Sequence, residues 1–153
     1  MTLRLADLET AALPELEALF ARNQVAPAQP APFRGKLLRW LGTPGARHPL
    51  YRPAEALMFQ RLPFGVDFAR RRWFWQSPRL GVGHFSASLG PSRWRDTTAL
   101  RLHYDDRLLP WALRARLYDE VKPLSDDLCL GIGGMDGARG HGDHFFFALY
   151  RSA

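Results

Sequence analysis

Along this chain the spacing of hydrophobic and polar residues changes near residue 33. Before that point the large apolar residues recur at intervals of three and four, as on one face of an α-helix, at Leu13, Leu16, Leu19 and Phe20. We therefore predict that residues 1–23 form an N-terminal helical segment. Its helix lies within Ala6–Asn23 and tolerates Pro14 if this proline occupies the first turn. Residues 24–33 hold three prolines and no periodicity, which predicts an extended connector.

Beyond residue 33 the pattern has the period of two that is typical of β-strands. It predicts strands at Arg34–Leu41, Arg70–Ser77, Arg79–Leu89, Thr97–Tyr104, Asp127–Ile132 and His144–Arg151. Within Thr97–Tyr104, Leu100 and Leu102 share one face with Tyr104, and the opposite face carries Arg101 and His103. The residues Glu55–Arg61 fit either a strand or a short helix, so the structure of the segment 53–68 stays open.

A second helix is predicted between the strands Thr97–Tyr104 and Asp127–Ile132. Asp106 is a suitable N-terminal cap, and an apolar stripe at four-residue spacing follows at Leu113, Leu117 and Val121. This helix must end before Pro123, because the residue preceding a proline is pushed out of the helical region.

The predicted order is a helix, about five strands, a helix and two final strands, joined by short connections. This order favours a single α+β domain over residues 1–153, in which residues 34–153 form a curved, mainly antiparallel sheet or a closed barrel. The glycines at Gly81 and Gly83 agree with this, since glycine inside a strand marks a bulge or a tight bend.

Composition supports one packed domain. The 153 residues are 46% hydrophobic and 12% aromatic, which is enough for a real core. Cys129 is the only cysteine, so no disulfide can form within the chain, as is typical of a reducing compartment. The first residues do not have the pattern of a signal peptide, and no apolar run is long enough to span a bilayer. We therefore predict a soluble, cytoplasmic protein.

The stretch from Leu100 to Gly131 carries a recognisable pattern: L-R-L-H-Y, a proline-tryptophan pair, R-L-Y-D-E-V-K-P-L and D-L-C-L-G. It resembles the C-terminal part of small bacterial proteins with lipocalin-like (calycin-type) barrels. The resemblance covers about the last third of the chain and implies a barrel with a central cavity. It implies no reaction, and the relatives often have Asp where this chain has His103.

The net charge of +6 is concentrated in the middle of the chain, where residues 34–101 carry thirteen Lys or Arg against three acids, a net +10. Such a segment is either a solvated strand surface or a surface for nucleic acid, an anionic membrane or an anionic ligand. Strand alternation divides Arg70, Arg71 and Arg72 between two faces, and no nucleic-acid-binding signature is present. We therefore expect at most weak binding of nucleic acid.

Candidate catalytic residues lie at the end of the strand Thr97–Tyr104. His103 is a possible general base because its pKa lies near neutrality, and Asp105 is a possible partner that orients it. Arg101 or Arg95 would stabilise developing negative charge. This chemistry requires the Arg101 and His103 face to line a cavity, and the pattern leaves open which face does so. Arg95 has a second interpretation, in which Arg95 and Asp96 form structural ion pairs with the predicted helix that bears Asp119 and Glu120.

Candidate ligand-binding residues are aromatic or basic and lie on strands. They are Trp73, Trp75, His84, Arg95, Arg101 and Tyr104. Trp73 and Trp75 share a strand face, so they either line a barrel interior or form a stacking surface for nucleic acid. His84 shares a face with Val82 and Ser86.

The glycine-rich run Gly131–Gly142 does not match a phosphate-binding loop, since a strand follows it where such a loop needs a helix. It is predicted to be a hairpin loop. His141 and His144 supply only two of the three or four ligands that zinc requires, so no metal and no cofactor are predicted.

The sequence favours a protein that binds a small molecule, largely apolar with a polar or anionic end, inside a barrel. The alternative is a small enzyme, an isomerase, cyclase or hydrolase, with His103 as its general base. The ligand and the oligomeric state stay open.

Overall fold

The structure is a computed structural model that describes residues 3–22, 28–41, 63–107, 111–114, 116–135 and 143–151. In chain order its elements are α1 (Leu5–Thr10), α2 (Leu13–Ala21), β1 (Pro32–Trp40), β2 (Phe64–Asp67), β3 (Arg72–Trp75), β4 (Gly81–Pro91), β5 (Thr98–Tyr104), α4 (Trp111–Arg114), β6 (Leu117–Ser125), β7 (Leu128–Met135) and β8 (Asp143–Tyr150). No helix in these ranges is long and apolar enough to cross a membrane.

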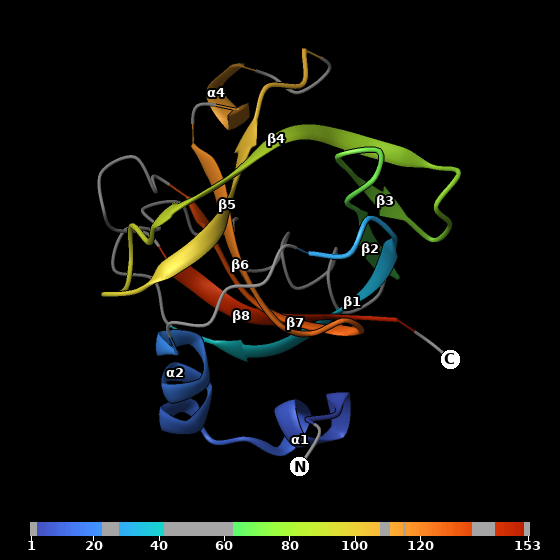
Figure 1. Cartoon of the computed structure of the whole chain (residues 1–153). Helices are drawn as coiled ribbons and strands as arrows, with labels where there is room; N and C mark the ends of the chain where they lie inside the picture. Colours follow the sequence, from blue (N-terminus) through green and yellow to red (C-terminus); the bar gives the residue numbers. More distant parts are fainter. Residues whose placement is uncertain are drawn as a thin grey trace.

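Each strand pairs antiparallel with the next one along the chain, and β8 pairs with β1, so the sheet closes into a barrel (Figure 1). The closing register sets Arg34 opposite Tyr150 and Trp40 opposite Phe145. The prediction of a mainly antiparallel α+β fold with a barrel-like sheet is confirmed, and the sheet closes fully.

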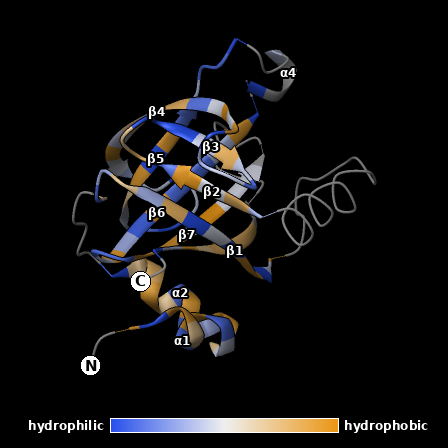
Figure 2. Cartoon of the chain, turned by 90° about the vertical axis from the view of Figure 1, so that its right-hand side faces the viewer, coloured by the Kyte–Doolittle hydropathy of each residue, from blue (hydrophilic) through white to orange (hydrophobic). Residues whose placement is uncertain are grey.

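Alternation along β8 divides the core into two parts. Phe145, Phe147 and Leu149 point into the barrel, where they meet the inner residues of the other strands. Phe146 and Ala148 point outward and are covered by the two N-terminal helices. On other strands of the barrel, Figure 2 shows hydrophobic and hydrophilic residues in alternation. Both faces of β7 and β8 are therefore buried, one inside the barrel and one beneath the helices.

The N-terminal segment forms two helices where one was predicted. Ala11 has an extended backbone and separates α1 from α2, and Pro14 then lies in the first turn of α2, where proline is tolerated. An acid in each first turn accepts a hydrogen bond from the backbone at the helix start, Asp7 from Arg4 at 2.8 Å and Glu15 from Ala12 at 2.7 Å. The helices pack against β7 and β8 outside the barrel (Figure 1).

The helix predicted after Asp106 is much shorter than expected. In the described part of this segment only α4 is helical, and Leu117–Ser125 is strand β6. Leu117 and Val121 therefore share a strand face, and their assignment to a helix was wrong. Residues four apart share a face on a strand as well as on a helix, which explains the error. Val121 points into the barrel, and Pro123 lies next to an irregularity in the β6–β7 pairing.

The predicted bend in β4 is confirmed at Gly83. Arg72 pairs with His84 and Trp73 with Val82, so Gly83 is an extra residue, and its φ of +66° is one that glycine adopts readily. The strand β2 lies in the segment 53–68 that the sequence left open. Glu55–Arg61, residues 24–27 of the connector and residues 136–142 of the glycine-rich loop, with His141, lie outside the described residues, and for His144 only the backbone is described.

Cys129 points into the barrel from β7 and has no exposed surface. Burial raises the pKa of its thiol from 9.0 to about 12. At pH 8 we therefore expect native protein to react with dithionitrobenzoate about a thousand times more slowly than the urea-unfolded chain, because the thiolate is the reactive form. Because the pKa is raised on folding, this group's contribution to stability should be complete below pH 9.0 and be lost as the pH rises toward 12. Equal labelling rates in the folded and unfolded protein would contradict the predicted protection of the Cys129 thiol.

Candidate functional site

A chain of polar groups crosses the aromatic interior of the barrel. The indole nitrogen of Trp73 donates to the Tyr104 hydroxyl at 2.5 Å, and that hydroxyl donates to the carboxylate of Asp119. Burial and the Asp119 charge raise the pKa of Tyr104 well above its ordinary value, so its hydroxyl remains the donor. Three strands, β3, β5 and β6, thus place a buried carboxylate against a phenol.

Aromatic rings surround this chain. The Trp73 ring lies 5.8 Å from the rings of both Phe64 and Phe147, and Tyr104 lies 6.3 Å from Phe85. Trp75 packs at the edge of the same cluster, 6.1 Å from Phe64. The structure therefore places Trp73, Trp75 and Tyr104 in or beside the barrel interior, as the first of the two interpretations of the tryptophans expected.

The structure decides which face of β5 is internal. Leu100, Leu102 and Tyr104 point into the barrel, so Arg101 and His103 lie on its outer face. The His103 ring packs 5.5 Å from Tyr118, and its pKa is lowered by partial burial and by the charges of Arg101 and Arg93.

The placement of His103 bears on the enzyme alternative, which required this residue in a cavity. Asp105 is exposed, and the hydrogen bonds among the described residues include none between Asp105 and His103. The structure therefore does not bring the two together inside the barrel, and their catalytic role stays a prediction.

Two further candidates lie away from the interior. Arg95 makes a forked ion pair with Glu17 of α2, from Nε to Oε2 at 2.6 Å and from Nη2 to Oε1 at 2.8 Å. This pair ties the loop before β5 to α2. Arg95 thus forms a structural ion pair as expected, but with Glu17, an acid that the sequence did not point to, and the expected helix with Asp119 and Glu120 is strand β6. His84 is exposed on β4, and its backbone nitrogen donates to Asp106 at 3.0 Å.

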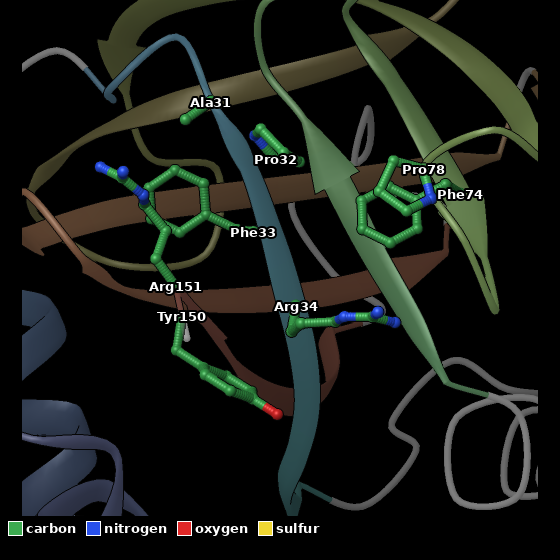
Figure 3. A pocket seen from close by; sticks show the side chains of 8 residues that line it. All are labelled: Ala31, Pro32, Phe33, Arg34, Phe74, Pro78, Tyr150 and Arg151. Carbon is green, nitrogen blue, oxygen red and sulfur yellow. The ribbon is translucent and has the colours of Figure 1, made fainter. Parts of the chain in front are cut away.

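A pocket of about 300 Å³ opens at the edge of the barrel, between β1, the turn after β3 and the end of β8 (Figure 3). It is lined by Ala31, Pro32, Phe33, Arg34, Phe74, Pro78, Tyr150 and Arg151. Phe33 belongs to the interior cluster, whereas Phe74 lies on the strand face opposite Trp73 and Trp75. None of the candidate residues named from the sequence lines this pocket. The only sequence pattern that bore on Phe74 is its position between Trp73 and Trp75, because neighbours on a strand point to opposite faces.

Two arginines supply positive charge to the pocket. Arg34 donates to the Gln76 carbonyl at 2.9 Å, and its guanidinium carbon lies 5.9 Å from the centre of the Phe74 ring. Arg151 pairs with Asp127 at 3.2 Å, and both side chains are well exposed, at 43% and 67%. Exposed pairs of this kind contribute about 0–1 kcal/mol, so an incoming anion can replace the carboxylate.

Comparison with known proteins reveals similarity in fold. No protein-family model matches the chain, and neither does any curated protein. The structure is similar to the crystal structure of a protein from Thermomonospora curvata, with a TM-score of 0.54 and 20% sequence identity. The match covers 97% of this chain and 93% of that chain. At this identity the likeness shows a shared fold alone.

Proposed function

We propose that this protein binds a small amphipathic molecule, largely apolar with an anionic end, in the pocket between β1, β3 and β8. The observation that supports this most directly is the meeting of three aromatic rings and two arginines in one pocket of about 300 Å³. Ligand sites typically combine apolar walls with a few polar groups, and this volume is at the small end of their range.

The pocket combines both faces of the sheet: Phe33 belongs to the barrel interior, whereas Phe74 and Arg34 share the outer face. Phe33 is 1% exposed and is fixed from behind by Phe68, with ring centres 5.6 Å apart. Figure 3 shows Arg34 extending toward Phe74 and Pro78, whereas Arg151 is drawn on the other side of β1. An apolar ligand body would lie against the rings, and Arg34 would donate to the anionic end through the N–H groups that Gln76 leaves unused.

The proposal keeps the ligand class expected from the sequence and moves the site to the barrel edge. The resemblance to bacterial lipocalin-like proteins is part of it, and the closed eight-stranded barrel supports that resemblance. The predicted cytoplasmic location is kept as well. It is supported by a single cysteine, Cys129, that is buried and unpaired.

The test uses two fluorescent probes that share one ring system. Anilinonaphthalene sulfonate carries an anionic group, and N-phenylnaphthylamine lacks it. We expect the sulfonate probe to bind and to be displaced by dodecanoate. Arg34→Gln should lower the affinity for the sulfonate probe about tenfold, which is the effect of losing one charge-assisted hydrogen bond. The affinity for the uncharged probe should not change.

Arg107→Gln is the matched control, because Arg107 is an exposed arginine that does not line the pocket. It should bind both probes as the unmodified protein does, and circular dichroism should show that both variants are folded. If Arg34→Gln leaves the affinity for the sulfonate probe unchanged, or weakens both probes equally, the anionic end is not bound at this pocket.

A further inference from the structure

A second group of polar side chains lies on the outer face of β5 and β6, far from the pocket at β1. We call Arg93, Arg101, His103, Tyr118 and Glu120 the Tyr118 cluster. Tyr118 is its centre. The Arg93 guanidinium lies over its ring at 4.8 Å, and the His103 ring lies 5.5 Å away. Strand pairing sets His103 opposite Tyr118 and Arg101 opposite Glu120.

The acid of this cluster, Glu120, is already hydrogen-bonded within the protein. Glu120 has no exposed surface, and its Oε1 accepts a hydrogen bond from the Arg93 backbone at 2.6 Å. Its Oε2 accepts one from the Ser92 hydroxyl. Glu120 therefore holds the loop before β5 in place. Its single negative charge faces two guanidinium groups, those of Arg93 and Arg101, so the cluster is positive overall even with His103 neutral.

Hydrogen-bonding capacity in this cluster is left unused. Glu120 also accepts from the Tyr118 hydroxyl, and burial together with this acid raises the Tyr118 pKa. Among the described residues, two other buried donors at this place have no hydrogen-bond partner: Arg101 Nε in the cluster and Nε1 of Trp94 beside it. Tyr118 is only 4% exposed, and the Trp94 ring packs on it at 5.1 Å. Leaving a buried polar group unpaired costs about 1–3 kcal/mol, so these two neighbouring donors require an explanation.

We propose that the Tyr118 cluster binds an oxyanion of the phosphate type at the outer surface of the barrel. The guanidinium groups of Arg93 and Arg101 are only partly buried and can donate, and a phosphate has several oxygens that accept. Arginine suits this role because its planar guanidinium bonds two oxygens at once. The proposal does not depend on the amphipathic ligand, since no residue of this cluster lines the pocket between β1, β3 and β8.

His103 provides the readout. Partial burial and the charges of Arg101 and Arg93 lower its pKa, whereas Glu120 opposes them. Tyr118 from β6 and the uncharged Ser86 from β4 complete its surroundings. A bound oxyanion would counter the two arginines and favour the imidazolium, so binding must raise the pKa of His103.

The experiment is an NMR titration of the histidine side chains in inorganic phosphate and in chloride at equal ionic strength. The His103 resonance is assigned by its loss in His103→Asn. We expect phosphate to raise the His103 pKa and chloride to leave it unchanged. Arg101→Gln should weaken phosphate binding tenfold or more, because it removes a charged donor.

Arg34→Gln serves as the matched control, because it removes an arginine from the other pocket and should leave phosphate binding intact. Conversely, Arg101→Gln should bind the sulfonate probe as the unmodified protein does, which separates the two sites. An equal response to phosphate and chloride would overturn the proposal. So would phosphate binding that survives Arg101→Gln in a folded protein.

Discussion

Lys122→Met should lower the free energy of unfolding by about 2–4 kcal/mol. The Lys122 side chain has no exposed surface, and its ammonium group donates three hydrogen bonds: to the Arg22 carbonyl at 2.6 Å, the Thr97 hydroxyl at 2.8 Å and the Thr98 carbonyl at 2.5 Å. These acceptors belong to the end of α2 and the start of β5. Methionine has a similar length and cannot donate, so it leaves three acceptors unpaired.

Urea unfolding followed by tryptophan fluorescence measures this loss. The chain has one other lysine, Lys36, which is 55% exposed and pairs with Glu9 at 3.2 Å. Lys36→Met is therefore the matched control, and its cost should stay below about 1 kcal/mol. If the two variants lose the same stability, Lys122 does not hold α2 to the barrel in the way that its contacts indicate.

The second large effect concerns the contact between Gly131 and Phe147. A Cβ atom added to Gly131 would lie 2.2 Å from the Phe147 ring, and this ring is held by Trp73 and Phe145 at 5.8 and 6.0 Å. Gly131→Ala should therefore cost about 1–3 kcal/mol through overpacking. Phe147→Ala should cost about 3–5 kcal/mol, because it empties a fully buried site.

The double variant distinguishes this contact from two independent effects. Once the ring is removed, the methyl group on residue 131 has space, so the double variant should be more stable than the two single losses together predict, by about 0.5–3 kcal/mol. Phe147→Leu replaces Phe147→Ala if the latter does not fold. Gly90→Ala is the control, since its nearest neighbour at 3.0 Å is the movable end of Arg101. If the two single losses of unfolding free energy simply add in the double variant, as measured by urea unfolding, Gly131 and Phe147 are not coupled as their contact predicts.

Local pattern was sufficient for much of the barrel. The strand Thr97–Tyr104 was predicted and is observed as β5 (Thr98–Tyr104), because its two faces differ in character. β6 was missed because both of its faces are buried, the inner one by the barrel and the outer one by α2 and the loop before β5. A strand without an exposed face loses the alternation by which it would be recognised.

The error at β6 also concealed part of the site. On a helix, Asp119 and Glu120 would project about 100° apart and would both lie near the surface. On the strand they point to opposite sides, so Asp119 joins Tyr104 inside the barrel and Glu120 joins Ser92 outside it. Tyr104 was a candidate from the sequence. Its partner Asp119 was not, because the segment that holds Asp119 had been assigned the period of a helix instead of that of a strand.

The edge pocket could not be predicted for a different reason. It depends on Arg34 lying opposite Tyr150, and these residues come from opposite ends of the chain. Local alternation shows which face of a strand is apolar. It does not show which strands will be neighbours or in what register they pair.

The pairing of β1 with β8 also has a consequence for the order of events during synthesis. Every other neighbouring pair in the barrel joins strands that follow one another along the chain. β1 emerges from the ribosome early, yet the strand that closes the ring against it is Asp143–Tyr150. Until that strand is made, β1 and β7 each present an unpaired edge that can pair with another chain. We therefore expect the nascent protein to be open to pairing with other chains until β8 is added, and we expect this long-range closure to slow its folding.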